Sequence, residues 1–489
     1  MKRLTLFLAL TVSLAAHGQR VIRQWVTTPD GSSLYAQGPE VPFADARPGR
    51  NVPIVVDDRQ AYQEMLGFGF SLTGGSAELL MKMSPARRSQ LLSELFGREP
   101  GQLGMGVVRL TVGASDMNSF VFSYDDMPEG STDWALEHFS LSQDLKDVVP
   151  VMQEILALNG SVWVMASPWS APAWMKEEYD VRGPKLRRDC YDVYARYLAR
   201  YVTEMGRNGI SIDALTIQNE PLNSRNTPSM PWSPEEQKIF IRDYLGPEFA
   251  RQGIETQILA FDHNCDRPDY PLSILEDPEA ARHVSGSAFH HYMGDLSAMT
   301  LMHDVRPDKD VYFTEQMIID RSGRPAAQIA PSVKRMLVDI PRNWSRTVIL
   351  WNLAADPEAN PHTGNGGCPF CFGAVTLDGD SVERNLAYYV VAHASETVPP
   401  GSFRIRSTGP SDPASILFED EQMPGVMRLM TYAESGVLPN VAFRTPDGNA
   451  VVIVANTSSS RQTVLFQHRG QFAQVSLPSG AVGTYVWPL

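Results

Sequence analysis

The sequence predicts an α/β fold, a (β/α)8 TIM barrel that carries a β-sandwich domain at its side. Between about residues 65 and 395, short apolar or β-branched runs alternate eight times with longer segments of helical periodicity. Such alternation favours parallel strands joined by right-handed crossovers. From about residue 401 to 489, strand-like runs separated by turn residues dominate, and further strand material lies in residues 20–58. A doubly wound open sheet is the alternative for the central region.

The expected barrel strands are apolar runs, several of which end in polar residues. Helical spacing fills the gaps between them, because apolar side chains recur at three- and four-residue steps over Gln143–Leu158 and over Tyr191–Met205. In chain order, the eight expected strands are Gly67–Thr73, Val107–Val112, Val162–Ser167, Ala214–Gln218, Thr256–Phe261, Gly286–Tyr292, Val311–Glu315 and Thr347–Asn352. A closed barrel is the economical way to arrange eight such parallel strands.

The regions that flank the barrel predict antiparallel β-structure. Val21–Thr27 and Val52–Val56 precede the barrel, and we expect them to pair with C-terminal strands so that both chain ends build one β-sandwich. The expected C-terminal strands are Gly425–Tyr432, Leu438–Arg444, Ala450–Ala455, Val464–Gln467 and Ala481–Trp487. The expected division is a signal peptide over 1–18, N-terminal sandwich strands over 19–60, the barrel over 61–397 and the C-terminal β-sandwich over 398–489.

The composition is that of a globular protein. Of the 489 residues 43% are hydrophobic, and 42 Lys and Arg stand against 56 Asp and Glu, which gives a net charge of −14. The disorder signature of low hydrophobicity with high net charge is therefore absent. An acidic chain also lacks the excess of basic residues that neutralises a phosphate backbone, which argues against nucleic acid as a partner.

The N-terminus has the layout of a secretory signal peptide. Lys2 and Arg3 precede an apolar run over residues 4–16, and His-Gly-Gln follows it. The run is shorter than the roughly 20 apolar residues that a membrane-spanning helix requires. We therefore expect cleavage near Gly18 and a secreted or periplasmic protein with no integral membrane segment after cleavage.

The four cysteines are too few for a disulfide scaffold in a chain of this length. Cys368-Pro-Phe-Cys371 is the one suggestive spacing, and a local disulfide that pins the glycine-rich loop 363–367 is the favoured interpretation. A zinc site is the alternative, but a second Cys-x-x-Cys pair is missing from the sequence. Cys190 and Cys265 are expected to be free core residues.

Two glutamates stand at the ends of expected barrel strands that are not neighbours. Glu220 lies in Gln-Asn-Glu-Pro after the fourth strand, and Glu315 lies in Thr-Glu-Gln at the end of the seventh. Because reactive residues of such barrels gather at the C-terminal ends of the strands, both carboxylates are expected at one mouth. Glycoside hydrolysis requires such a pair. A salt-bridged rim residue is the alternative for either glutamate alone.

Other polar and aromatic residues follow the same strand ends. Aromatic rings stack on the C–H faces of sugars, and carboxylates, amides and imidazoles bind the hydroxyl groups. His290 and Tyr292 share one face of their strand, so we favour this pair over His291. Alternative roles are a helix cap for Asp116 and plain core packing for the tryptophans. The candidate binding and supporting residues are Arg109, Asp116, Trp169, Asn219, His290, Tyr292 and Trp351.

These residues lie in motifs that resemble glycoside hydrolase family 30, the glucosylceramidase-like retaining β-glycosidases. The motifs are GFGFSLTGGSAELL, VVRLTVGASDM, MASPWSAPAWMK, LTIQNEP, AFHHY, FTE, WNLAADPEANPHTGNGGCPFCFGAVTLDG and AYYVVAHASETVPPGSFRIRS. The resemblance implies that Glu220 is the acid/base, that Glu315 is the nucleophile and that Asn219 binds the sugar 2-hydroxyl. It also implies a barrel with a side β-sandwich. The residues that it places around the non-reducing sugar are Asp116, Trp169, Tyr292 and Trp351.

The sequence departs from the family pattern at positions that leave the carboxylates intact. Gly74-Gly75 stands where an acidic residue and alanine are more usual, and His291 replaces a more usual tryptophan. The favoured function is a retaining β-glucosidase, glucosylceramidase-like, acting on a glucosyl lipid or another β-glucoside. The alternative is a β-1,6-glucanase, and a xylanase or an inactive glycan-binding protein is less favoured. The partner is then a carbohydrate or a glycolipid.

The mechanism predicts opposite protonation states for the two glutamates. Repulsion between the carboxylates is expected to raise the pKa of Glu220 so that it can act as the acid. His290 and Arg109 are expected to hold Glu315 ionised. The reaction requires neither a metal nor an organic cofactor, so none is expected.

Overall fold

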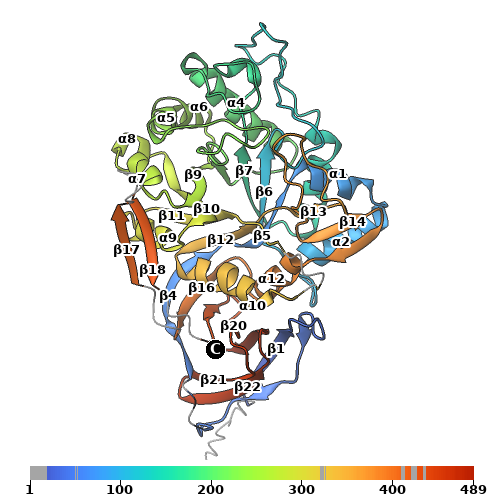
Figure 1. Cartoon of the computed structure of the whole chain (residues 1–489), viewed down its shortest axis with the longest axis vertical. Coiled ribbons are helices and arrows are strands. Elements are labelled where there is room, and N and C mark those ends of the chain that lie inside the picture. The colour runs from blue at the N-terminus through green and yellow to red at the C-terminus, as the bar shows by residue number, and fades with distance from the viewer. Residues whose placement is uncertain are drawn as a thin grey trace, which may run out of the picture.

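The computed structural model describes residues 19–49, 51, 53–319, 324, 326–408, 414–419, 427–432 and 437–489. A barrel surrounded by helices forms the upper part of Figure 1, and a β-sheet domain forms the lower part. The expected signal peptide lies outside the described residues. No helix of the described ranges is long and apolar enough to cross a membrane.

Eight parallel strands close into a barrel, as the sequence predicts. The strands are β5 (Gly67–Leu72), β6 (Val107–Val112), β7 (Trp163–Pro168), β8 (Ala214–Thr216), β9 (Gln257–Cys265), β10 (Val284–Gly294), β11 (Asp310–Glu315) and β12 (Ser345–Leu350). The order is β10-β11-β12-β5-β6-β7-β8-β9, and the ring closes where β9 pairs with β10. The open-sheet alternative is therefore wrong.

The barrel interior is layered, with an apolar layer below a polar one. Seven strands contribute one buried side chain each to the apolar layer: Val107, Met165, Ala214, Leu259, Ala288, Tyr312 and Ile349. The next inward position on a strand lies two residues further on. On five of these strands that position is polar and fully buried: Arg109, Ser167, Thr216, His290 and Thr314. Polar chemistry thus begins directly above the apolar layer.

Helices surround the barrel. The helices are α1 (Gly74–Lys82), α2 (Pro85–Phe96), α3 (Val148–Leu158), α4 (Tyr191–Arg207), α5 (Pro234–Phe240), α6 (Gly246–Gln252), α7 (Asp269–Leu275), α8 (Pro278–Ala281), α9 (Ser297–Val305), α10 (Ile329–Val333), α11 (Ile340–Arg342) and α12 (Leu386–Ser395). π-helical turns continue α5 over Ile241–Leu245 and α10 over Lys334–Asp339. Both helices predicted from apolar spacing are present, as α3 and α4.

Both ends of the chain build the second domain, as predicted. Its strands are β1 (Val21–Thr27), β2 (Ala36–Gln37), β3 (Val41–Pro42), β4 (Ile54–Met65), β16 (Ser402–Ser407), β19 (Asn440–Arg444), β20 (Asn449–Ala455), β21 (Gln462–His468), β22 (Gln471–Leu477) and β23 (Val482–Pro488). β1 pairs with β23, and β4 pairs with β16 and β21. A bridge between Ala44 and Phe472 joins distant parts of the sheet around a core of its own. The strand β4 continues past the boundary that the sequence places between residues 60 and 61. The expected domain boundaries stay a prediction.

One predicted sandwich strand belongs elsewhere. β18 (Met427–Tyr432) pairs with β17 (Ala414–Glu419) in a separate two-stranded sheet that lies beside the barrel, next to α9 and β10 (Figure 1). The prediction of a strand was right and its assignment to the sandwich was wrong, because alternation of side chains predicts a strand but does not choose its partner. A third small sheet, β13 (Ala354–Ala355), β14 (Val375–Asp378) and β15 (Ser381–Arg384), follows the last barrel strand.

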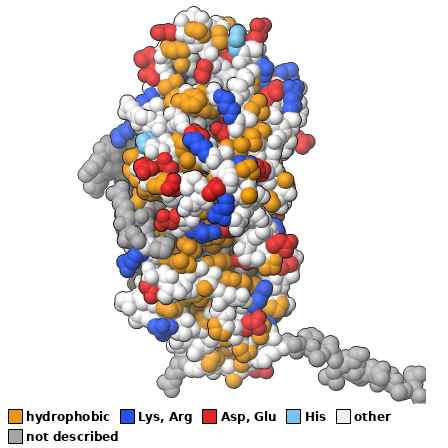
Figure 2. All heavy atoms as spheres, turned by 90° about the vertical axis from the view of Figure 1, so that its right-hand side faces the viewer, with side chains coloured by type: hydrophobic (Ala, Val, Ile, Leu, Met, Phe, Trp, Pro, Cys, Tyr) orange, Lys and Arg blue, Asp and Glu red, His pale blue; other side chains and the backbone are white. Residues whose placement is uncertain are grey.

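The surface carries charges of both signs. Figure 2 shows acidic, basic and apolar side chains interspersed over the face turned to the viewer. Many of the charged groups form local ion pairs, such as Arg59 with Asp57 at 2.8 Å and Lys82 with Glu78 at 2.6 Å.

His393 of α12 joins the barrel to the sheet domain through two strands. Its Nδ1 lies 2.9 Å from the Thr484 hydroxyl of β23, and its Nε2 lies 2.8 Å from the Thr27 hydroxyl of β1. The Thr484 hydroxyl donates to the His393 carbonyl, so it accepts from Nδ1–H. This network assigns a neutral imidazole, and burial lowers the pKa of His393 to about 3.

Stability should therefore depend on pH through His393. Since its folded pKa lies below the unfolded value of about 6.5, its contribution is complete above pH 6.5 and is lost as the pH falls. We expect the difference in free energy of unfolding between the wild type and His393→Leu to shrink by about 2 kcal/mol between pH 7 and pH 5. Urea denaturation followed by circular dichroism measures it. A difference that does not change with pH would contradict a neutral buried His393.

Candidate active site

A cavity of about 630 Å³ opens at the C-terminal ends of the barrel strands. Of the nine site residues that the sequence predicts, seven line this cavity: Asp116, Trp169, Asn219, Glu220, Tyr292, Glu315 and Trp351. The other two, Arg109 and His290, are fully buried beneath it. The structure thus brings all nine residues into one region.

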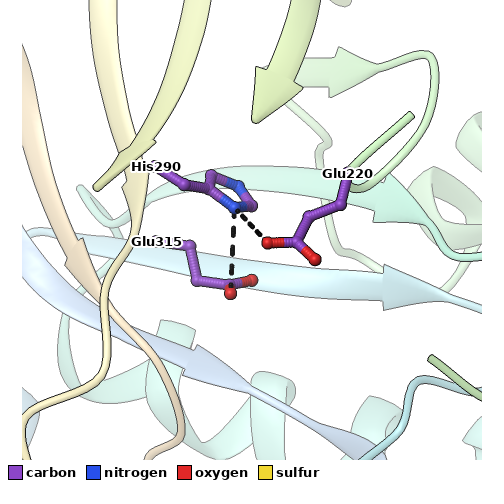
Figure 3. Close-up of side chains that lie close together, drawn as sticks. All are labelled: Glu220, His290 and Glu315. Atoms are coloured by element: carbon purple, nitrogen blue, oxygen red, sulfur yellow. Dashed lines mark hydrogen bonds and ion pairs between the residues drawn. The ribbon is translucent and has the colours of Figure 1, made fainter. Parts of the chain in front are cut away.

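The two glutamates face each other across the cavity floor (Figure 3). One carboxylate oxygen of Glu220, one of Glu315 and a ring nitrogen of His290 lie within 4.8 Å of one another. Glu220 follows β8 with a φ of 47°, and its backbone N–H donates to the Asp262 carbonyl at 3.0 Å. Glu315 is the last residue of β11. The short distance between the Glu220 and Glu315 oxygens suits a reaction in which one carboxylate attacks the sugar directly. A pair that activates water instead is held further apart, so that the water fits between the sugar and the carboxylate.

Arg109 of β6 holds Glu315 and Asn219 in place. Its Nη1 donates to Glu315 at 2.6 Å, and its Nη2 donates to Asn219 Oδ1 at 2.7 Å. Because Asn219 uses its oxygen for Arg109, its amide N–H₂ is turned the other way, and Asn219 lines the cavity. The guanidinium also lies 4.9 Å from the ring centre of Trp169. Arg109 therefore fixes the positions of three cavity residues at once.

Tyr292 and His290 each contact one of the two glutamates by a hydrogen bond. The Tyr292 hydroxyl donates to Glu315 at 3.0 Å, and His290 Nδ1 lies 3.2 Å from Glu220. Their shared side of β10 agrees with the alternation of side chains in a strand. His291 is not among the described residues that line the cavity.

An aromatic pair and a buried acid form the opposite wall. Trp169 and Trp351 stack with ring centres 5.3 Å apart, and they are 1% and 4% exposed. They are therefore largely core residues with a small part of their surface exposed to the cavity. Burial and the negative charge of Glu315 and Glu220 raise the pKa of Asp116 to about 8. Asp116 is thus protonated at neutral pH and can donate as well as accept a hydrogen bond.

The protonation of Glu220 differs from the expectation. Burial acts to raise its pKa, but the hydrogen bond from His290, the charges of the two neighbouring histidines and the hydrogen bond from Asn223 together outweigh burial and lower the pKa of Glu220 to about 2. Burial raises the pKa of Glu315, while the charges of His290 and Arg109 oppose that rise. The expectation for Glu220 was wrong for the ligand-free site because it counted repulsion between carboxylates and left out the imidazolium beside Glu220.

A disulfide-bonded loop covers one side of the cavity. Cys368 and Cys371 form the predicted disulfide, and residues 366–371 of this loop line the cavity. Gly366 has a φ of 104°, and a Cβ there would lie 2.4 Å from the Arg225 carbonyl oxygen, so only glycine fits. Cys190 and Cys265 are buried and free, as predicted. Because the disulfide occupies both sulfur atoms of the Cys-x-x-Cys pair, the zinc alternative is wrong.

The three residues Asp262, His263 and Asn264 of β9 were missed by sequence analysis. Asp262 accepts from Arg109 at 2.9 Å, and Asn264 Oδ1 accepts from the Tyr292 backbone N–H at 2.9 Å. His263 lines the cavity, and its Nε2 lies 4.0 Å from Glu220. The polar run Asp-His-Asn directly after an apolar strand was the available signal, because the other strand ends of the site carry the same pattern.

Three side chains of the site are of the types that bind metal ions. Among the described residues, Glu220, His290 and Glu315 are close enough together to hold an ion. The Arg109 guanidinium lies 2.6 Å from Glu315, and the pKa of His290 is raised to about 9. Two positive charges therefore already lie beside these carboxylates, which disfavours a further cation between them.

Comparisons with known proteins agree on the fold and on the family of enzymes. The model described as "Glycosyl hydrolase family 30 TIM-barrel domain" matches residues 65–363, and the model of the corresponding "beta sandwich domain" matches residues 425–485. The endo-1,6-beta-D-glucanase BGN16.3 of Trichoderma harzianum is 30% identical over 443 residues, 87% of this chain and 84% of that protein. The lysosomal acid glucosylceramidase of Mus musculus is 26% identical over 469 residues, 90% of this chain and 84% of that protein.

Two solved structures share this fold. "The endo-beta1,6-glucanase BT3312" superposes with a TM-score of 0.83 at 29% identity, covering 96% of this chain and 100% of that one. The SrfJ protein of Salmonella typhimurium superposes with a TM-score of 0.84 at 27% identity, with the same coverage.

Removing the Arg109 cation should destabilise the fold. In Arg109→Gln the buried carboxylates of Asp262 and Glu315 both lose the guanidinium that pairs with them, so we expect the free energy of unfolding to fall by about 3–5 kcal/mol at pH 7. Denaturant titration followed by circular dichroism measures the change. The matched control is Arg59→Gln, which breaks an exposed ion pair with Asp57 and should change stability by about 0–1 kcal/mol. Equal losses in the two variants would contradict the role assigned to Arg109.

Proposed function

The chain belongs to glycosyl hydrolase family 30 and is a glycoside hydrolase, and from this premise we propose that it cleaves β-glucosidic bonds with retention of configuration. In this proposal Glu315 is the nucleophile and Glu220 is the acid/base. The observation that carries it is the pair of buried carboxylates from β8 and β11, close together at the floor of one cavity. Retaining enzymes hold such groups about 5 Å apart, whereas inverting enzymes leave room for water.

The first step forms a bond between enzyme and sugar. Glu315 attacks the anomeric carbon, and Glu220 protonates the departing oxygen. Two donors, Arg109 at 2.6 Å and Tyr292 at 3.0 Å, keep the Glu315 carboxylate oriented for this attack. In the second step Glu220 takes a proton from water, whose oxygen displaces Glu315 from the sugar. Neither step requires a metal or an organic cofactor.

The same proposal assigns sugar contacts to the remaining cavity residues. The amide of Asn219 lies between Arg109 and the cavity, which supports a hydrogen bond to the 2-hydroxyl. Protonated Asp116 can bind a hydroxyl on the far side of the ring. The parts of Trp169 and Trp351 that line the cavity provide apolar surface for the C–H face of the sugar. Tyr292 contacts Glu315 and lines the same subsite.

The leaving group is either a lipid or a sugar. A glucosyl lipid is the substrate favoured from the sequence, and β-1,6-glucan is the second candidate. One observation favours the second: polar side chains adjoin Glu220 in the cavity wall, where Asn223 and Asn226 donate to its Oε2, and Arg225 and Asp266 line the same cavity beside the apolar Leu222 and Met293. A sugar leaving group finds hydrogen-bonding partners there, whereas a lipid needs continuous apolar surface.

The proposed location is outside the cytoplasm, in the periplasm or the medium. It rests on the N-terminal pattern of two basic residues and an apolar run over residues 4–16. A polysaccharide substrate is compatible with this location, because an exported enzyme meets polysaccharides outside the cell.

The assignment of Glu315 is tested by Glu315→Gln. The neutral amide cannot attack, so turnover of a 4-nitrophenyl β-glucoside should fall by roughly 10⁴-fold or more, while the thermal unfolding midpoint stays close to that of the wild type. Undiminished turnover would sink the assignment. Proton NMR of the first-formed sugar is an independent check, since the β-anomer must appear first if configuration is retained.

The assignment of Glu220 is tested by the leaving group. In Glu220→Gln, substrates with poor leaving groups should lose roughly 10²–10⁴-fold in kcat/KM, because they need the proton, whereas 2,4-dinitrophenyl β-glucoside should lose much less. Added azide should restore turnover with the dinitrophenyl substrate and yield a glycosyl azide of retained configuration. A loss that is equal for good and poor leaving groups would speak against an acid role.

The choice of substrate is tested by parallel assays. Purified wild-type protein is incubated with β-1,6-linked gluco-oligosaccharides and with glucosylceramide in detergent, and released glucose and shorter oligosaccharides are quantified. We expect hydrolysis of the oligosaccharides to proceed with the higher kcat/KM, because the polar wall beside Glu220 binds a sugar. Faster release from glucosylceramide would overturn this preference and leave the retaining mechanism in place.

A further inference from the structure

The Asp262 carboxylate lies at the centre of the polar layer of the barrel. It is fully buried and is not among the described residues that line the cavity. Five side chains from five other strands donate to it. Oδ2 accepts from Arg109 at 2.9 Å, Ser167 at 2.8 Å and Thr216 at 2.8 Å. Oδ1 accepts from His290 at 3.0 Å and Thr314 at 2.7 Å.

The backbone of β9 is distorted to bring Asp262 inward. Leu259 belongs to the apolar layer, so strict alternation would turn Phe261 inward and Asp262 outward. Instead Phe261 and Asp262 have φ values of 80° and 71°, a region that non-glycine residues rarely occupy. Phe261 packs outward against Tyr270, with ring centres 4.8 Å apart. Such local strain persists where surrounding contacts impose it, and functional sites are where it concentrates.

His290 connects Asp262 to the proposed acid/base. Because Asp262 is ion-paired with Arg109, it is ionised and accepts the Nε2–H of His290. The other ring nitrogen, Nδ1, faces Glu220 Oε1 at 3.2 Å (Figure 3). This hydrogen bond holds one proton, which resides either on the imidazole or on the carboxyl group.

We propose that Asp262 is a positioning residue for the acid/base group: through the Nε2–H of His290, it controls whether the shared proton resides on His290 Nδ1 or on Glu220 Oε1. The proposal rests on the proposed function, in which Glu220 is the acid/base. Asp262 itself does not touch the substrate, and it acts only through His290.

The charges around His290 place the proton on the imidazole in the empty site. Three carboxylates surround the His290 ring: Asp262 of β9, Glu220 after β8 and Glu315 of β11. The Oε1 atom of Glu315 lies 3.8 Å from Nδ1. The rings of His263 and Tyr292 lie further off, with centres 6.3 Å away, and Arg109 acts from behind Asp262. Burial opposes a charged imidazole, but the carboxylates outweigh burial and raise the pKa of His290 to about 9.

The proton then moves along this hydrogen bond during the reaction. The Nδ1–H bond of His290 breaks and an O–H bond forms on Glu220, which leaves a neutral imidazole still donating through Nε2–H to Asp262. Glu220 passes the proton to the glycosidic oxygen, which keeps the electron pair of the broken C–O bond. In the second step Glu220 takes a proton from the attacking water, and that proton returns to His290.

The test is Asp262→Asn, which keeps the shape of the side chain and removes its charge. Without that charge the imidazole holds its proton less tightly, so we expect the basic limb of the kcat/KM profile to move to lower pH by about 1 to 3 units. The loss of kcat/KM at pH 7 should be at least about tenfold larger for an alkyl β-glucoside than for 2,4-dinitrophenyl β-glucoside, because the alkyl leaving group needs the proton.

Two further variants separate this role from a structural one. Thr216→Val removes a neutral donor from Oδ2 and leaves the charge of Asp262, so its basic limb should stay where it is in the wild type, and its loss should not depend on the leaving group. Thr314→Val removes the neutral donor that competes with His290 for Oδ1. The basic limb of Thr314→Val should therefore move to higher pH, the opposite direction, which keeps the proposal testable if Asp262→Asn does not fold.

The proposal is overturned if the basic limb is unchanged in both Asp262→Asn and Thr314→Val, or if the loss in Asp262→Asn is the same for both leaving groups. A separate measurement is ¹⁵N NMR of histidine-labelled wild-type protein, in which the His290→Asn variant assigns the His290 signals. Both ring nitrogens of His290 should be protonated at pH 7. A neutral His290 ring would also overturn the proposal. Failure of the proposed function looks different, since it would appear as undiminished turnover in Glu220→Gln or Glu315→Gln.

Discussion

The buried ion pair between Arg109 and Asp262 is the interaction on which the site depends. Both side chains are fully buried, and their charged groups lie 2.9 Å apart. Neither charge could stay in the barrel interior alone, because an unpaired buried ion is strongly unfavourable. Each partner then uses its remaining atoms on the site: Arg109 contacts Glu315 and Asn219, and Asp262 contacts His290. The two glutamates are thus positioned from one central pair.

The layering of the barrel explains why this pair lies where it does. A closed apolar layer that includes Val107, Met165 and Tyr312 fills the lower interior. The next inward positions carry hydrogen-bonding side chains, and those of five strands meet at the Asp262 carboxylate. Because every donor there has an acceptor, polar groups can be buried without the usual penalty. The layer forms a rigid floor beneath a cavity open to solvent.

The charged groups of the site form ion pairs at short distances. The positive groups are Arg109 and His290, and the negative groups are Asp262, Glu315 and Glu220. Asp116 is protonated at neutral pH, since its pKa is raised to about 8. One negative charge therefore remains in the ligand-free site, and a transition state with positive charge on the sugar ring is favoured by it. The position of the proton shared by His290 and Glu220 decides whether Glu220 is ionised.

The sequence by itself determined the strand order of the barrel, the sandwich shared by both chain ends, and most of the site. Apolar runs ending in Asn219-Glu220 and in Glu315 are local patterns, and parallel closure brings such strand ends together. Only the tertiary structure decided the position of Asp262, because a reversal of alternation at Phe261 and Asp262 depends on contacts with five other strands. The partner of β18 and the low pKa of Glu220 were decided in the same way. Strand pairing and electrostatics depend on residues far apart in the chain, which no local pattern contains.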